Sequence, residues 1–213
     1  MTDENYRNKG LIRKLMDIIL KEYEGYDLIY LFANDSVLDF YPKFGFKRVI
    51  EGKYKMDVKE INKLKLNNEH MIKLDLKNEE HRKITKRLAE DRSPISQELG
   101  IIKDGSILSL YCNYEFRDDL YYLKEEDIIV ILRRENNVVK LYDILSQDNI
   151  ILDNIISKIL RKEDMEMQFN FIPKSKKYKI SFELVDKQDD TLFVKEGKET
   201  LEDGILFPKP SHT

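Results

Sequence analysis

A basic, glycine-containing turn near the N-terminus has the composition of a phosphate-binding site. Residues 5–16 read Asn-Tyr-Arg-Asn-Lys-Gly-Leu-Ile-Arg-Lys-Leu-Met, so the turn at Gly10 runs directly into a helix-like pattern. Backbone N–H groups at a helix N-terminus, with the positive end of the helix dipole behind them, can hold a pyrophosphate. The turn therefore predicts a cofactor that carries a pyrophosphate, and the alternative is an ordinary solvated helix start.

The apolar spacing after the turn predicts the elements that would position it. Leu11, Leu15, Ile18 and Ile19 fall on one stripe of a helix over residues 11–23. The following residues predict a strand buried on both faces at 26–33 and a short helix at 37–44, which begins after Asn34-Asp35-Ser36. A second strand is expected at residues 46–57, and a linker at residues 58–68.

The rest of the sequence predicts a second unit with an antiparallel core. A charged helix is expected over residues 77–90, and an apolar helix over residues 152–160. Strands are expected at residues 71–76, 107–114, 128–134, 138–145, 166–172 and 181–185. Glu135-Asn136-Asn137 between two of these strands is typical of a hairpin turn.

Composition favours a globular, cytoplasmic protein and argues against two kinds of partner. The chain has 37 basic and 40 acidic side chains, so its net charge is only -3, and nothing selects nucleic acid. No apolar stretch is long enough to cross a membrane. The single cysteine, Cys112, lies in an apolar run and is expected in the core. His70, His81 and His212 have no spacing that would gather them on one metal ion, so no metal is predicted.

Residues 2–57 resemble the second half of a known enzyme family. The order of turn, amphipathic helix, buried strand, Asn34, short helix and Tyr41-Pro42-Lys43-Phe44-Gly45-Phe46 is similar to that of the GNAT superfamily of N-acetyltransferases. In that superfamily an Arg/Gln-x-x-Gly-x-Gly/Ala turn holds the pyrophosphate of acetyl-CoA, and a Tyr-x-x-x-Gly-Phe signature follows. The resemblance implies an α+β fold, with mixed sheets and flanking helices.

The resemblance also implies a role for each candidate site residue. The turn that would hold the pyrophosphate of acetyl-CoA consists of Arg7, Asn8, Lys9, Gly10, Leu11 and Ile12. Asn34 would contact the pantetheine arm, or would only cap a helix. Tyr41 matches the family's general acid, which protonates the departing CoA thiolate, although a core tyrosine would also fit the pattern. No general base is named, because acidic residues are too numerous to choose among.

Two departures from the family pattern are plain. Ile12 stands where the family usually has Gly or Ala, so the backbone is expected to approach the pyrophosphate less closely. Met1 falls at the expected end of the strand before the turn, so the resemblance implies that the earlier strands are absent and that the polypeptide starts inside a longer protein.

The C-terminal part resembles the second unit of two-part bacterial GNAT proteins. Its matching segments are Ser93-Pro94-Ile95-Ser96, Asp119-Leu120-Tyr121-Tyr122 and the closing residues 206–213. The expected domains are therefore the C-terminal half of a GNAT domain at residues 1–66 and a degenerate GNAT-like domain at residues 67–213. Residues 143–149 contain neither glycine nor arginine, so no second acetyl-CoA site is expected.

Two functions follow from these observations. The first is an N-acetyltransferase that transfers acetyl from acetyl-CoA to a small-molecule or peptide amine. The sequence does not identify the acceptor, and a homo-oligomer is one of the partners considered. The second is a non-catalytic, truncated GNAT-like protein with a role in binding or assembly.

Overall fold

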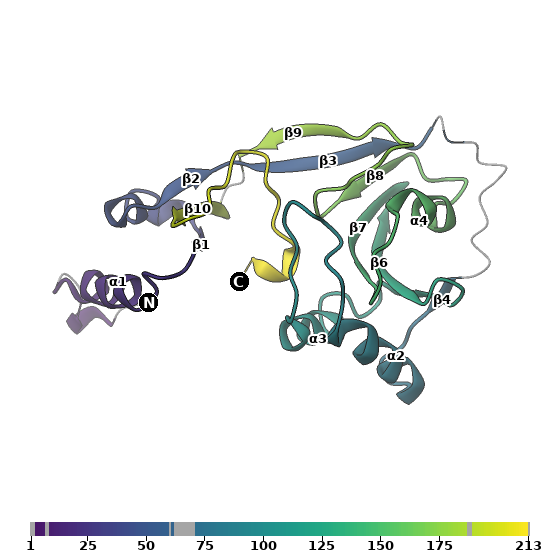
Figure 1. Cartoon of the computed structure of the whole chain (residues 1–213), viewed down its shortest axis with the longest axis horizontal. Coiled ribbons are helices and arrows are strands. Elements are labelled where there is room, and N and C mark those ends of the chain that lie inside the picture. Colours follow the sequence, from purple (N-terminus) through teal and green to yellow (C-terminus); the bar gives the residue numbers. More distant parts are fainter. Residues whose placement is uncertain (1–2, 7–8, 60, 62–70, 187–188, 213) are drawn as a thin grey trace. The chain divides into compact units, whose positions relative to one another are not determined.

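The chain contributes to two separate sheets, and each sheet belongs to its own compact unit (Figure 1). The computed structural model describes residues 3–6, 9–59, 61, 71–186 and 189–212. Unit 1 consists of Met1–Ile50 with Asp186–Asp203, and unit 2 consists of Glu51–Val185 with Gly204–Thr213. The chain therefore leaves unit 1, builds most of unit 2, and returns to unit 1 before its last residues. The GNAT domains expected at residues 1–66 and 67–213 rest on family resemblance and remain a prediction.

Unit 1 is a small antiparallel sheet with one α-helix. Its strands lie in the order β1-β10-β2, so the strand from the far end of the sequence occupies the centre. The described elements are η1 (Glu4–Tyr6), α1 (Leu11–Glu22), β1 (Leu28–Ala33), the 3-10 helices η2 (Asp35–Val37) and η3 (Tyr41–Phe44), β2 (Lys47–Val49) and β10 (Thr191–Glu196).

The core of unit 1 is mostly aromatic. Ala33, Phe44, Phe46 and Phe193 are buried there, and partly buried side chains of α1 pack against them. Those α1 side chains are Met16 and Leu20, whereas Leu11, Leu15 and Ile18 are 42%, 55% and 61% exposed. The helix itself is confirmed, but most of the stripe read from the sequence lies on its outer side. Apolar residues extend around so much of α1 that spacing alone did not identify the face that packs inward.

This difference predicts unequal costs for two similar substitutions on α1. Leu20→Ala removes packing from the core of unit 1, so we expect it to lower the free energy of unfolding by about 2 kcal/mol. Leu15→Ala removes an exposed side chain, and we expect a change of less than about 0.5 kcal/mol. Urea denaturation of both variants measures the difference. Equal costs would contradict the placement of α1 on the sheet.

Three local predictions for the first part of the chain need correction, and the linker expected over residues 58–68 lies mostly outside the described residues. The single strand expected over residues 46–57 is divided at Ile50 into β2 and β3 (Glu51–Asp57), which belong to different sheets. The strand expected to be buried on both faces is β1, an edge strand of the described sheet whose residues are mostly half-buried. The helix expected over residues 37–44 is instead split between η2 and η3. Pro42 lacks an N–H and fits only the start of a helical turn, and Gly45 ends η3 in a left-handed conformation with φ 83°. These residues therefore form short turns.

Unit 2 is a seven-stranded mixed sheet with helices on both faces. The described strands have the order β4-β5-β6-β7-β8-β3-β9, in which the pair β7–β8 is parallel and the other neighbouring pairs are antiparallel. The described elements are β3 (Glu51–Asp57), β4 (Met71–Lys73), α2 (Glu79–Glu90), α3 (Gly105–Asn113), β5 (Leu120–Leu123), β6 (Ile128–Glu135), β7 (Val138–Leu145), α4 (Leu152–Ile159), β8 (Glu166–Phe169), β9 (Ser181–Val185) and η5 (Lys209–Ser211).

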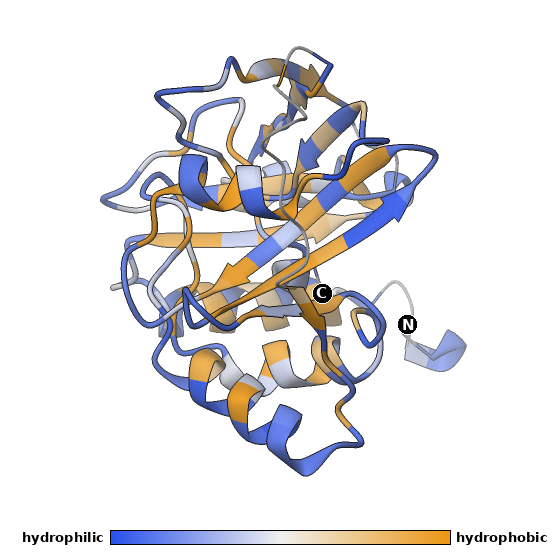
Figure 2. Ribbon diagram, turned by 90° about the vertical axis from the view of Figure 1, so that its right-hand side faces the viewer, coloured by the Kyte–Doolittle hydropathy of each residue, from blue (hydrophilic) through white to orange (hydrophobic). Residues whose placement is uncertain are grey.

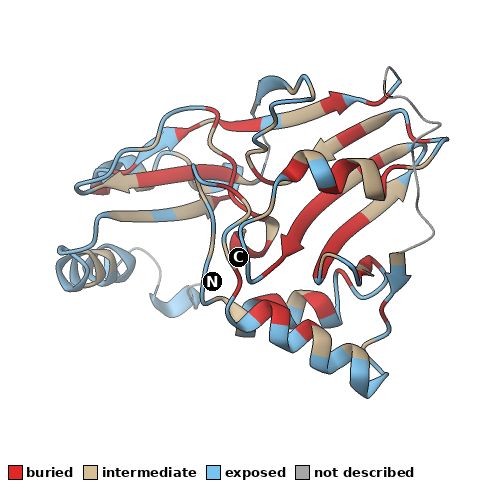
Figure 3. Ribbon diagram, turned by 45° about the vertical axis from the view of Figure 1, so that its right-hand side comes forward, coloured by how far each residue is buried: buried red, intermediate tan, exposed pale blue. Residues whose placement is uncertain are grey.

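The two faces of this sheet have separate hydrophobic cores, and successive side chains of β6 point alternately into one core and the other. Val130 packs on the face covered by α4, whereas Ile129 and Ile131 pack on the face covered by α2 and α3. Figure 2 shows apolar stretches along the strands and helices, and Figure 3 shows long buried stretches along β6 and β7. The run Ile-Ile-Val-Ile-Leu at the start of β6 is explained by burial on both sides.

Most local predictions for unit 2 are confirmed, and one is wrong. Helices α2 and α4 and the β6–β7 hairpin form as expected, and Asn136 and Asn137 take the positive φ values of 50° and 64° that a tight turn requires. The strand expected over residues 107–114 is instead helix α3. Leu108 and Cys112, one helical turn apart, are its buried residues, as expected for one face of a helix.

Candidate functional site

The first candidate feature is the start of α1, where Gly10 occupies the N-cap position with a left-handed φ of 69°. The first helical hydrogen bond runs from the Lys14 N–H to the Gly10 carbonyl, over 3.1 Å. The amides of residues 11–13 therefore precede the internal hydrogen bonds of the helix. Within the described part of the chain, no side chain caps this end. Such an end has backbone donors available for an anion.

Two described side chains next to this helix start are exposed. Ile12, which departs from the family motif, is 49% exposed and is not part of the core of unit 1. Lys9 is exposed, and its ammonium lies 5.2 Å from the centre of the Tyr6 ring. A basic residue therefore directly precedes the N-cap residue Gly10. The predictions for Arg7 and Asn8 lie outside the described residues.

Asn34 has a structural role. Its side-chain oxygen accepts a hydrogen bond from the Ser36 N–H at 3.0 Å and a second one from the Ser36 hydroxyl. The N-cap expected from the sequence is therefore present, at the start of η2. A contact of Asn34 with pantetheine stays a prediction.

Tyr41 stands at the first position of η3, inside an aromatic cluster. Its ring centre lies 5.4 Å from that of Phe40, 6.0 Å from that of Phe46 and 5.6 Å from that of Phe193. The residue is partly buried, so the ring packs on the core while part of the side chain stays accessible. This placement fits both roles considered for Tyr41.

The turn that carries Tyr41 is held by a residue that sequence reasoning missed. Lys195 of β10 donates a hydrogen bond from its Nζ to the Phe44 carbonyl, over 2.9 Å. Phe193 of the same strand contacts the Tyr41 ring. The apolar run Leu192–Val194 was the only local signal for this strand, and its pairing with residues near position 30 could not be read from the sequence.

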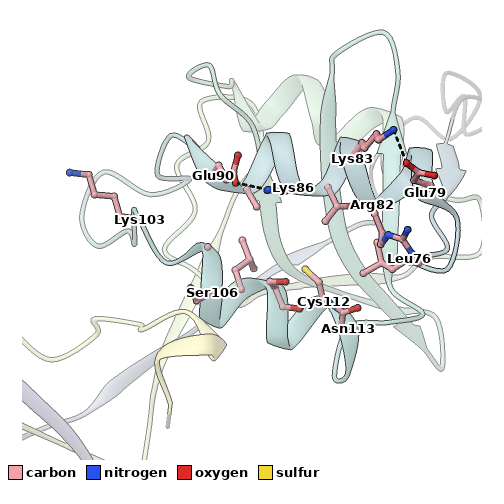
Figure 4. Close-up of a pocket in the computed structure, with 15 residues that line it drawn as sticks. Leu76, Glu79, Arg82, Lys83, Lys86, Glu90, Lys103, Ser106, Cys112 and Asn113 are labelled. Carbon is pink, nitrogen blue, oxygen red and sulfur yellow. Dashed lines mark hydrogen bonds and ion pairs between the residues drawn. The ribbon is translucent and has the colours of Figure 1, made fainter.

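A second feature, in unit 2, is a groove of about 850 Å³ between α2 and α3 (Figure 4). Lys83 and Lys86 on its rim are paired with Glu79 and Glu90 of the same helix. Cys112 lies among the lining residues, and burial raises the pKa of its thiol to about 12. The thiol is therefore protonated at neutral pH, and this groove contains no ready cysteine nucleophile.

Two of the three histidines have identified contacts within unit 2. The His81 Nδ1 accepts a hydrogen bond from the Asp75 N–H at 2.9 Å, at the start of α2. The His212 Nε2 lies 3.2 Å from the Phe207 carbonyl oxygen. His70 lies outside the described residues. Of the helices in the described ranges, none has the length and apolar character to cross a membrane.

Comparisons with known proteins agree with the predicted resemblance. Residues 1–46 match the acetyltransferase (GNAT) family. No curated protein matches the sequence. Among solved structures, Eis1 from Mycobacterium abscessus is similar with a TM-score of 0.51 and 11% identity, over 91% of this chain and 53% of that one. A conserved protein from Enterococcus faecalis V583, described as a probable N-acyltransferase, is similar with a TM-score of 0.54 and 13% identity, over 91% and 51%.

The chain thus spans about half the length of these two solved structures. At this identity the similarity concerns the fold. It agrees with the expected α+β class, its mixed sheet and its flanking helices. Together these findings confirm the predicted resemblance: residues 1–46 match the acetyltransferase (GNAT) family, and the chain has a GNAT-like α+β fold.

Proposed function

We propose that this chain takes part in the transfer of an acetyl group from acetyl-CoA to an amine. The amides that open α1 bind the pyrophosphate, with Lys9 beside them. Asn34 lies near the pantetheine arm, and Tyr41 serves as general acid. The acceptor is a small-molecule or peptide amine. The observation that carries this proposal is the uncapped helix start after a left-handed Gly10, within the segment that matches the family.

In this reaction the protein positions the two substrates and supplies one proton. The acceptor amine gives up a proton and forms a C–N bond to the acetyl carbonyl, while the bond between that carbonyl and the CoA sulfur breaks. The departing thiolate takes the proton of the Tyr41 hydroxyl. Transfer of the amine proton to solvent and return of a proton to Tyr41 complete the cycle.

A second candidate is a non-catalytic GNAT-like protein with a role in binding or assembly. The residue that favours it is Ile12, which stands where the family usually has Gly or Ala. Isothermal calorimetry with CoA separates the candidates. Binding together with turnover supports the enzyme, binding without turnover supports the second candidate, and no heat at millimolar CoA contradicts the cofactor site. Homo-oligomer formation also remains a proposal, and the exposed Leu11, Leu15 and Ile18 support it.

The helix-start site predicts opposite effects of one substitution on stability and on binding. Ile12→Glu places a carboxylate in the first turn of α1, where it interacts favourably with the helix dipole and stabilises the fold by about 0.3–1 kcal/mol. The same charge repels a pyrophosphate, so we expect CoA affinity to fall about tenfold. Calorimetry and urea denaturation measure the two effects.

The matched control is Ile18→Glu, which adds the same charge to an exposed position farther along α1. We expect its CoA affinity to stay within about twofold of the parent, because residue 18 lies about 9 Å along the helix from residue 12 and salt screens repulsion over such a distance. If Ile12→Glu binds CoA as tightly as Ile18→Glu does, the pyrophosphate does not bind at the start of α1.

A further inference from the structure

Two side chains of β10 contact the turn on which Tyr41 stands. The Tyr41 and Phe193 ring centres are 5.6 Å apart, and the Lys195 Nζ donates to the carbonyl of Phe44, the last residue of η3. Phe193 and Lys195 are two positions apart on a strand, so they project from the same face of β10. One face of this strand therefore contacts both the ring and the end of its turn.

The strand that provides these contacts is firmly placed. β10 is the central strand of unit 1, paired with β1 on one side and with β2 on the other. Phe193 is 2% exposed, so its ring is fixed by packing. Because β10 is a central strand and Phe193 is buried, the backbone from which Lys195 extends to the turn is held in place.

The end of the turn is also held by the Phe44 side chain, which is buried in the core of unit 1 with its ring centre 5.0 Å from that of Phe40. η3 is a single 3-10 turn, too short to be stable alone. It closes with a hydrogen bond of 3.1 Å from the Gly45 N–H to the Pro42 carbonyl. A Cβ at Gly45 would lie 2.9 Å from the Lys195 Nζ, and φ is +83° there, so a side chain would disturb the place where the lysine approaches.

We propose that Lys195, held by β10, is a positioning residue that fixes the Tyr41 turn through its hydrogen bond to the Phe44 carbonyl. The consequence for acetyl transfer rests on the proposed function of Tyr41. A general acid must be held within hydrogen-bond reach of the leaving group, and a misplacement of about 1 Å can cost up to about 100-fold in rate. Lys195 thus links residues near the C-terminus to a candidate catalytic residue near the N-terminus.

The first test needs no acceptor and no turnover. Tyrosines are labelled with ¹³C, and the Tyr41 signal is identified by its loss in Tyr41→Phe. In Lys195→Met we expect this signal to shift or broaden, and in Lys195→Arg, which keeps a charged donor, to return toward the parent position. Lys47→Met is the matched control, because Lys47 is an exposed lysine of β2 that pairs with Glu196 of β10 at 2.6 Å. Its Tyr41 signal should not change.

The second test separates positioning from general stability. In Lys195→Met we expect kcat to fall about tenfold, with KM for acetyl-CoA within about twofold of the parent and with recovery in Lys195→Arg. Lys195→Gln replaces Lys195→Met if the latter does not fold. An unchanged Tyr41 signal in the folded variant overturns the inference. A changed signal in a chain without acetyl transfer supports the positioning role and counts only against the proposed function.

Discussion

Replacing Arg92 by Met is expected to lower the free energy of unfolding by about 3–5 kcal/mol. The Arg92 side chain is 3% exposed, and its guanidinium donates to Asp104 at 2.8 and 3.1 Å and also to Asp143. These two aspartate side chains are 6% and 5% exposed. Without Arg92, two carboxylates would remain buried with no cation between them. Urea denaturation at neutral pH measures the loss.

The cost of this substitution should depend on pH. Burial raises the pKa of the Asp143 carboxyl above its ordinary value of 3.8, against the opposing effect of Arg92. The folded protein therefore binds this proton more tightly than the unfolded chain does. Stability from this group is fully present below the unfolded pKa and is lost as pH rises through the higher folded pKa. Removal of Arg92 raises the folded pKa further, so we expect the variant to recover part of its stability on acidification.

Arg87→Met provides the matched control. Arg87 also binds an aspartate with two hydrogen bonds, of 2.7 and 2.6 Å to Asp127, but both side chains are nearly half-exposed. An exposed pair contributes little, and we expect a loss of less than about 1 kcal/mol. If the two substitutions cost the same, the Arg92 cluster is not the buried ion cluster that the structure describes.

Replacing Tyr41 by Phe is expected to lower kcat for acetyl transfer about 100-fold, while CoA affinity stays within about twofold. The ring of Phe keeps the contacts with Phe40, Phe46 and Phe193, so the turn should remain in place. What is lost is the hydroxyl that would protonate the thiolate. Release of free CoA from acetyl-CoA, in the presence of a panel of primary amines and lysine peptides, measures the rate, and calorimetry measures the affinity.

Tyr26→Phe is the control for this experiment. Tyr26 is 62% exposed and lies outside the core of unit 1, so loss of its hydroxyl should leave both rate and affinity unchanged. An unaltered kcat in Tyr41→Phe would remove Tyr41 from the mechanism and would leave it as a packing residue.

Elements with strong local signals were predictable from the sequence. The β6–β7 hairpin joins adjacent strands through two asparagines with positive φ, and α2 begins directly after Asn78, whose side chain caps the helix. Such features depend on residues a few positions apart. The helix α3 was mistaken for a strand because its short apolar run satisfies both periodicities, and only the contact of Leu108 and Cys112 with α2 and the sheet decides between them.

Some residues of the candidate site could be predicted from local sequence, and others could not. Gly10, Asn34 and Tyr41 were found from motifs, because each stands in a local turn with a characteristic residue order. Phe193 and Lys195 were not found, since their role depends on β10 pairing with strands more than 140 positions earlier in the chain. A hydrogen bond of 2.9 Å to a backbone carbonyl has no signature in the residue type of either partner.

The amino-acid sequence by itself determined the helix start at Gly10, most helices and the hairpin, because backbone preference and periodicity act over a few residues. Only the tertiary structure decided which strands share a sheet, which side of α1 packs inward, and that β10 completes the unit containing Tyr41. The physical reason is that strand pairing and burial depend on contacts between distant segments, and the same apolar residues can satisfy several such arrangements.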